Sequence, residues 1–192
     1  MILLEPNRKY YTIRELKDMG CTYYKIGKME EEGLIRRINR SAYENLCCNR
    51  GGNAFVDAAA YVPEGVICQM SAARYYGLTD INSETVDMAI DRKKKVSTLP
   101  VSPDMKIFYF DPARMSSGVT QIREGGDTFH IFNMEKTVVD IIYYRNKIGI
   151  EDASDVLRNY LKRQDRKIDR LYAYAKLLRC RAVIKTYLEV LV

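Results

Sequence analysis

The sequence predicts an α+β protein in two domains. Three observations lead to this prediction: two short helical segments with a hairpin lie within residues 1–48, four strand-like runs lie within residues 85–132, and helical periodicity dominates residues 135–192. The second domain is therefore expected to span residues 53–192 and to combine a small, mostly antiparallel sheet with C-terminal helices.

The first helical segment is TIRELKDM, which starts with Thr12 as its cap and ends before Gly20. The Thr12 side-chain oxygen can accept a hydrogen bond from an early backbone N–H, and Glu15 completes a capping-box pattern three residues later. Gly20 suits the left-handed conformation at a helix C-terminus, so the chain can turn sharply there. The segment before Thr12 contains Pro6 and has no helical period, so we expect either a short strand or a shortened first element.

A second helix is predicted between Thr22, as its cap, and Gly33, which stops it. Helical spacing places Ile26 and Met29 on the side that faces the core. A strand-like run follows from Leu34, and a turn and a return strand complete a hairpin. Helix, tight turn, helix and hairpin within about 35 residues form the layout of a winged helix-turn-helix domain.

The outer face of the second helix carries candidate DNA contacts, because the N-terminal part of this helix normally enters the major groove. Lysine can pair with phosphates or guanine edges, and tyrosine hydroxyls can bond phosphates. Arginines on the hairpin would follow the DNA backbone. The predicted DNA-binding residues are Tyr23, Tyr24, Lys25 and Lys28 on the helix, with Arg36, Arg37 and Arg40 on the hairpin.

The same residues fit a second interpretation, in which a solvated helix and a charged hairpin form a protein-interaction module that does not bind DNA. The acidic run Glu30-Glu31-Glu32 lies at the far end of the helix and disfavours deep phosphate contact there. The basic outer face of the helix favours DNA binding over the interaction module.

Four strand-like runs follow in the second domain, after two predicted helices, AFVDAAAYV and MSAARYYGLT. Prolines and the pair Gly125-Gly126 separate the runs, which favours a small, mostly antiparallel sheet. The predicted strands are Thr85–Ile90, Lys106–Phe110, Gly118–Ile122 and Thr128–Phe132.

The charge distribution favours a polyanionic partner at the ends of the chain. The formal net charge is +6 and the pI about 9.0. Residues 1–50 carry 10 Lys and Arg against 7 Asp and Glu, residues 51–150 carry 11 against 12, and residues 151–192 carry 10 against 6. Basic residues near the C-terminus alternate with apolar stripes, so they form either a solvated face or a surface for an acidic partner or nucleic acid.

The cysteines and the hydropathy pattern predict a cytoplasmic protein. The five cysteines form no CxxC pair and no signal peptide precedes them, which favours a reducing compartment. No apolar stretch approaches the roughly 20 residues that a membrane-spanning helix needs. With His130 as the single histidine, we expect no metal site and no cofactor.

A metal-dependent nuclease is the enzymatic alternative, because Asp87, Asp91 and Lys93 resemble a carboxylate–lysine site. All three lie on one extended run, whereas converging carboxylates on a metal ion requires a two-strand arrangement. No nucleophile elbow, Walker lysine or Gly-rich phosphate loop occurs. The sequence therefore predicts no catalytic set, and the chain is not expected to be an enzyme.

Two stretches carry a resemblance to a known family: PEGVICQMSAARYYGLTDINSETVDMAIDRK, and FHIFNMEKTVVDIIYYRNKIGIEDASDVLRNYLKR. They resemble the AbiEi-type antitoxins of bacterial type IV toxin–antitoxin systems, a phage-defence family of abortive infection proteins. Residues 135–149 are the most specific part, and Gly33 through Tyr43 matches the wing of the family's N-terminal domain. The resemblance covers nearly the whole chain, and the departure from the family is the weak first helix near Pro6.

The resemblance implies that the N-terminal domain binds inverted repeats in the promoter of its own operon and represses it. Inverted repeats would bring two copies of the chain onto one DNA site. The C-terminal domain would counteract a cognate nucleotidyltransferase-like toxin, by direct contact or indirectly. We place the toxin-antagonism surface at Arg158, Lys162 and Arg166.

Overall fold

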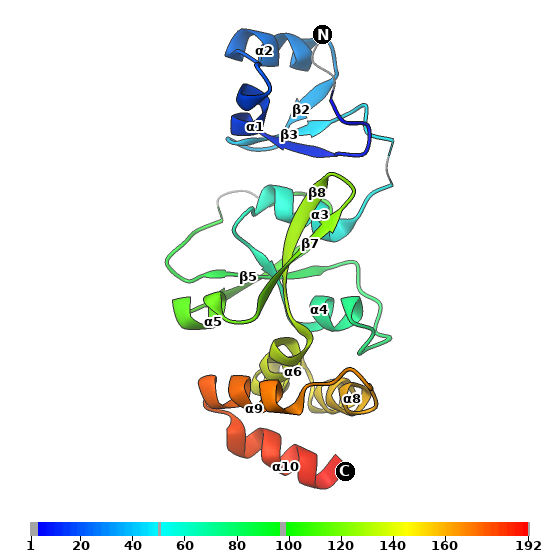
Figure 1. Cartoon of the computed structure of the whole chain (residues 1–192), viewed down its shortest axis with the longest axis vertical. Helices are drawn as coiled ribbons and strands as arrows, with labels where there is room; N and C mark the ends of the chain where they lie inside the picture. The colour runs from blue at the N-terminus through cyan, green and yellow to red at the C-terminus, as the bar shows by residue number, and fades with distance from the viewer. Residues whose placement is uncertain (1–3, 50, 97–98, 192) are drawn as a thin grey trace. The chain divides into compact units, whose positions relative to one another are not determined.

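The computed structural model describes residues 4–49, 51–96 and 99–191. Within these residues the chain is mixed α+β, with one three-stranded antiparallel sheet and one five-stranded mixed sheet (Figure 1). The predicted α+β class is therefore confirmed. The predicted ranges also include residues 1–3, 97–98 and 192, which lie outside the described residues.

Contacts along the chain divide it into two compact units. The division falls at residue 64 rather than between residues 48 and 53, and two later segments join the N-terminal part. The first unit comprises residues 1–64, 96–103 and 121–129, and the second comprises residues 65–95, 104–120 and 130–192.

The N-terminal part of the first unit contains three short strands and three helices. The strand order is β1-β3-β2, and both pairings are antiparallel. The segment before the first helix is therefore a short strand, one of the two alternatives predicted for it. The elements are β1 (Tyr10–Thr12), α1 (Ile13–Asp18), α2 (Tyr23–Glu31), β2 (Ile35–Arg37), β3 (Ala42–Asn45) and α3 (Ala54–Tyr61).

Local hydrogen bonds explain where α1 and α2 begin and end. The Thr12 hydroxyl accepts from the backbone N–H of Glu15, and the Glu15 carboxylate accepts from Thr12, so the predicted capping box is present. Thr22 caps α2 by accepting from the N–H of Lys25. Gly20 and Gly33 have φ angles of 85° and 70°, a left-handed conformation that favours glycine and ends both helices sharply.

Two buried or half-buried carboxylates connect the N-terminal strand to distant parts of the first unit. The Asp57 carboxylate on α3 lies 2.7 Å from the Lys9 ammonium and accepts from the Tyr10 hydroxyl at 2.9 Å. The Asp127 carboxylate accepts from the backbone N–H groups of Lys9 and Tyr10, at 2.8 and 2.9 Å. Asp127 is only 5% exposed, so it takes the place of water for two backbone donors.

The hairpin that carries Asp127 also approaches the N-terminal segment closely. The backbone N–H of Gly126 donates to the Asn7 carbonyl at 3.3 Å. A Cβ atom at Gly126 would lie 2.6 Å from the Arg8 Cβ, so only glycine fits there without a shift. Residues 121–129 are thus an integral part of the first unit.

The second unit contains the greater part of the five-stranded sheet and seven helices among the described residues. Strands β7 and β8 begin or end in the first unit, since residues 121–129 cluster there. The elements are β4 (Val66–Ile67), α4 (Gln69–Tyr75), β5 (Val86–Asp91), β6 (Met105–Phe110), α5 (Pro112–Ser116), β7 (Val119–Glu124), β8 (Asp127–Phe132), α6 (Met134–Tyr143), α7 (Arg145–Ile148), α8 (Ile150–Leu161), α9 (Ile168–Leu177) and α10 (Arg181–Leu191).

The sheet order is β6-β5-β4-β8-β7, and the prediction of a mostly antiparallel sheet was wrong. Strand β5 pairs in parallel with β6, and β4 pairs in parallel with β8. A parallel pair needs a connection of about a dozen residues, and residues 92–104 between β5 and β6 supply it. The two-residue strand β4, which was not predicted, lies between β5 and β8 and pairs with both.

The core of the second unit is built around α6, which packs against α4, α8 and α9 (Figure 1). Helix α6 is buried on nearly all sides, with no exposed surface at Val138, Val139, Ile141 or Ile142. Its charged residues Glu135, Lys136 and Asp140 are buried as well, so the other helices are arranged about it.

A buried ion network lies along α6. The Lys136 ammonium and the Arg114 guanidinium both bond the Asp140 carboxylate, the latter at 2.8 Å, and Arg114 also donates to the Tyr144 hydroxyl at 3.1 Å. Lys136 and Asp140 have no exposed surface. Burial lowers the pKa of Lys136, whereas at Arg114 the carboxylate outweighs the effect of burial and raises the pKa. Two cations therefore share a single carboxylate.

Aromatic rings surround these buried cations. The Lys136 ammonium lies 4.3 Å from the centre of the Phe132 ring, and the Arg114 guanidinium lies 4.3 Å from the centre of the Phe110 ring. Ring faces attract cations, and they partly replace the water that both groups lose on folding. The network thus fastens α5 to α6.

Candidate nucleic-acid interface

Helix α2 has a buried side and an exposed side. Ile26 and Met29 are 2% and 9% exposed, which confirms that they face the core of the first unit. At 100° per residue, the direction opposite this pair is occupied by Tyr24, Lys28 and Glu31, with Gly27 beside them and Tyr23 and Lys25 on the two flanks. The helix therefore presents the predicted contact residues away from its own core.

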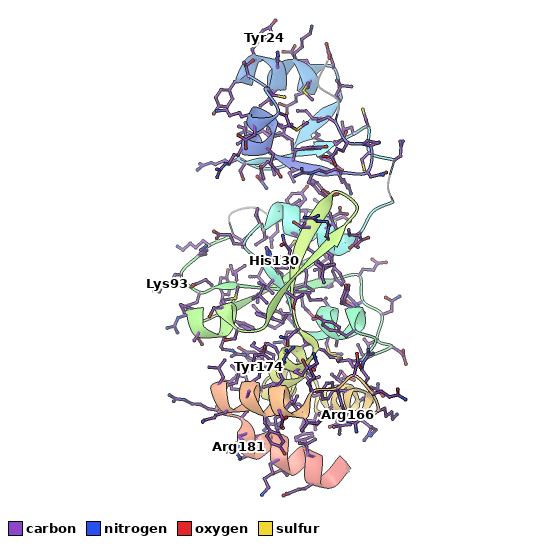
Figure 2. The ribbon with its side chains drawn as sticks, viewed as in Figure 1. Tyr24, Lys93, His130, Arg166, Tyr174 and Arg181 are labelled. Carbon is purple, nitrogen blue, oxygen red and sulfur yellow. The ribbon has the colours of Figure 1, made fainter. Side chains whose placement is uncertain are left out.

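The exposed side of α2 is strongly solvated. Tyr23 and Tyr24 are 65% and 82% exposed, and the side chains of Lys25 and Lys28 are exposed as well. Figure 2 shows Tyr24 projecting from α2 away from the rest of the first unit. An exposed tyrosine offers a partner both an apolar ring and a hydroxyl that can form hydrogen bonds.

The N-terminal end of α2 favours anions. Backbone N–H groups in a first helical turn have no helical partner, and the helix dipole adds a partial positive charge there. Gly27 leaves open space above the helix, because a Cβ built at this position meets no atom within 4 Å. A phosphate backbone or a base edge could therefore approach the α2 backbone closely.

Sequence reasoning missed Lys17, which joins this face from α1. Its ammonium lies 3.7 Å from the centre of the Tyr23 ring, so α1 contributes a further positive charge beside the start of α2. Arg14 on α1 is also exposed. The capping box defines the direction of α1, but the approach of Lys17 to Tyr23 depends on how the two helices pack.

The three hairpin arginines are all exposed, and they differ in their contacts. Arg36 lies opposite Glu44 in the β2–β3 register and pairs with it at 2.5 Å, which neutralises part of its charge. The Arg37 guanidinium donates to the carbonyls of Asn39 and Arg40, at 3.1 and 3.4 Å, and is held over the turn. The Arg40 side chain makes no hydrogen bond or ion pair with the described part of the chain.

The turn between β2 and β3 is pinned by Asn39. Its side-chain oxygen accepts from the backbone N–H of Ser41 at 2.9 Å, and its amide nitrogen donates to the Ala60 carbonyl at 3.0 Å. An ordered turn presents Arg37 and Arg40 together in one place. Arg37 and Arg40 are therefore the hairpin residues best placed to hold a phosphate, while Arg36 is committed to Glu44.

The predicted toxin-antagonism residues lie in the second unit, at the end of α8. Arg158 pairs with Asp155, the Lys162 ammonium donates to the Asn159 side chain at 3.5 Å, and the Arg166 guanidinium donates to the Arg163 carbonyl at 2.6 Å. All three predicted residues are exposed, with Arg158 on the helix, Lys162 at its C-cap and Arg166 in the loop that follows.

The two carboxylates considered for a nuclease site, Asp87 and Asp91, each bond backbone groups nearby. The Asp87 carboxylate accepts from the backbone N–H of Ser71 at 3.3 Å, and burial raises the pKa of Asp87. Asp91 accepts from the backbone N–H of Lys93 at 2.8 Å and shapes a turn. Among the residues that the structure describes, no three His, Cys, Asp or Glu side chains gather as metal ligands would.

Two further findings bear on function. Within the described ranges, no helix combines the length and the apolar character needed to cross a membrane. Neither a protein-family model nor a curated protein sequence matches this chain.

Proposed function

We propose that this protein is an antitoxin that also represses its own operon, as the resemblance to AbiEi-type antitoxins implies. In this proposal residues 1–48 act as a winged helix-turn-helix, bind inverted repeats in the promoter as paired copies, and work in the cytoplasm without a cofactor or catalytic activity. The observation that carries the proposal is the open side of α2, where Tyr24 and Lys28 stand opposite the buried Ile26 and Met29.

The arrangement around α2 supports the DNA-binding part. The helix follows a sharp turn after α1, its N-terminal turn is capped and exposed, and an antiparallel hairpin with Arg37 and Arg40 follows it. We assign Tyr23, Tyr24, Lys25 and Lys28 to the major groove, with Lys17 beside them, and Arg37 and Arg40 to phosphates.

Replacing Lys25 and Lys28 by alanine is expected to weaken binding to the operon's own promoter fragment. Each lysine that neutralises a phosphate contributes about 0.9 to the slope of log affinity against log salt, so the slope should become shallower by about 2. Both side chains are exposed, so the fold should be unaffected. A gel-shift titration at several salt concentrations measures both quantities.

The matched control, K176A/K185A, removes two exposed lysines from the second unit. It therefore has the same net charge as the K25A/K28A variant. Its promoter affinity and salt slope should equal those of the unmodified protein. If both variants lose the same promoter affinity, the effect depends on net charge alone. If neither variant loses affinity, the result supports the alternative of an interaction module that binds no DNA. The exposed Tyr23 and Tyr24 favour that alternative as the second candidate, since tyrosine is enriched in protein interfaces.

The antitoxin part of the proposal concerns the exposed basic residues at the end of α8. Reversing three charges, R158E/K162E/R166E, is expected to abolish growth rescue when the protein is co-expressed with the toxin encoded beside it. The matched control K176E/R181E/K185E reverses three charges on α9 and α10, and it should retain rescue. Full rescue by the α8 variant would show that its surface is only solvated.

A further inference from the structure

A basic turn of four consecutive residues, Arg92–Lys95, follows strand β5 in the second unit. All four side chains are exposed, and Figure 2 shows Lys93 among side chains that extend outward from the ribbon. The proposed function makes no use of this turn. Apart from this turn, residues 51–150 carry 7 Lys and Arg against 12 Asp and Glu, so the basic turn is the main concentration of positive charge in the middle of the chain.

The backbone of the basic turn is ordered by three hydrogen bonds. The N–H of Arg92 donates to the Phe110 carbonyl at 2.8 Å, which extends the β5–β6 pairing by one residue. The N–H of Lys93 donates to the Asp91 carboxylate at 2.8 Å, and the N–H of Lys94 donates to the Asp91 carbonyl at 2.9 Å. A turn held in this way presents its side chains without a further loss of backbone freedom on binding.

The positive charge of the basic turn is largely uncompensated. Arg92, Lys93 and Lys95 form no ion pair or side-chain hydrogen bond with the part of the chain that the structure describes. Two nearby carboxylates are already used by backbone donors: Asp91 at the end of β5 accepts the Lys93 N–H, and Asp111 at the N-cap of α5 accepts the Arg114 N–H at 3.1 Å. Arg92, Lys93 and Lys95 therefore leave a positive surface that attracts a polyanion.

We propose that the basic turn binds the phosphates of double-stranded DNA, as a second contact that does not depend on base sequence. Residues 92–96 include no aromatic side chain, whereas surfaces for single-stranded nucleic acid combine basic residues with aromatic rings on which bases stack. Compact lysine ammonium groups on an ordered turn suit backbone phosphates. The choice of DNA as the polyanion rests on the proposed function.

The test uses a duplex of scrambled sequence and the full-length chain. The variant R92A/K93A/K95A keeps Lys94 and should make the salt slope shallower by about 2 to 3, because each lost phosphate contact removes about 0.9. The matched control K176A/R181A/K185A removes three exposed cations from α9 and α10, and it should keep the slope of the unmodified protein. Thermal unfolding by circular dichroism checks that both variants are folded.

The same measurement in the K25A/K28A background separates this proposal from the proposed function. The decrease in salt slope caused by R92A/K93A/K95A should persist in this background, because the basic turn and α2 are assigned different DNA contacts. If R92A/K93A/K95A leaves the salt slope unchanged in both backgrounds, or if the control K176A/R181A/K185A changes it equally, the basic turn is not a DNA contact. The assignment of α2 to DNA would not be affected by either result. Displacement of the duplex by poly-glutamate or single-stranded RNA at equal charge concentration would overturn the assignment to duplex DNA.

Discussion

Replacing Asp140 by alanine is expected to lower the free energy of unfolding of the second unit by about 3–5 kcal/mol, the usual cost of removing one partner from a buried ion pair. The substitution leaves the Lys136 ammonium and the Arg114 guanidinium without their shared carboxylate. Both cations lie under aromatic rings, where water does not replace the lost bonds. Urea unfolding followed by circular dichroism measures the change, since the chain has no tryptophan.

The variant Lys136→Met is the matched comparison. Methionine fills a similar volume, and Asp140 keeps its bond to Arg114, so the destabilisation should be clearly smaller than that of Asp140→Ala. If Asp140→Ala unfolds within about 1 kcal/mol of the unmodified protein, the network has no structural importance, since surface substitutions usually have effects of that size or less.

Replacing Asp127 by alanine is expected to destabilise the first unit by about 2–6 kcal/mol, because two buried donors are left unsatisfied and each costs about 1–3 kcal/mol. The carboxylate serves the backbone N–H groups of Lys9 and Tyr10 together, and it is 5% exposed. The amide hydrogens of these two residues should then exchange with solvent much faster. Hydrogen exchange followed by nuclear magnetic resonance measures this for each residue separately.

The graded variant Asp127→Asn keeps the shape of the side chain and one acceptor oxygen, so it should protect one of the two amides and cost less stability. A Glu5→Ala substitution at the exposed start of the chain serves as a control that removes an acid without a buried role. Unchanged exchange at Lys9 and Tyr10 in Asp127→Ala would contradict the anchoring role of the carboxylate. Loss of promoter binding in the same variant would follow from unfolding of the first unit.

Signals between neighbouring residues predicted the helices of the first unit closely. The capping box of Thr12 with Glu15 spans three positions, and the burial of Ile26 and Met29 follows from helical spacing alone. Both features depend on the local chain, so the sequence contains all that is needed to find them. The four predicted strands of the second domain are present for the same reason.

Pairing between distant segments was the part that the sequence did not reveal. Strand β4 has two residues, too few for an alternating pattern, yet it lies between β5 and β8 and makes the sheet mixed. In the sequence, Asp127 resembles an ordinary turn residue. Its hydrogen bonds with the backbone N–H groups of Lys9 and Tyr10 are seen only in the folded structure. Non-local contacts of this kind leave no periodic signal in the chain.

In the candidate site, too, local features were predicted and contacts between separate elements were not. Helical spacing was enough to predict that Tyr24 and Lys28 point outward, and both are exposed. The pairing of Arg36 with Glu44 requires the β2–β3 register, and the stacking of Lys17 on Tyr23 requires the packing of α1 on α2. Which charges are free to meet a partner therefore depends on tertiary structure.

The inclusion of residues 121–129 in the first unit has a consequence for protein synthesis. Ribosomes deliver the N-terminal end first, and a domain made of one continuous segment can fold as soon as it emerges. Here the carboxylate that holds Lys9 and Tyr10 arrives only with residue 127. A nascent chain that ends before residue 127 lacks this anchor, so the first unit completes its buried contacts only after residues 121–129 have left the ribosome.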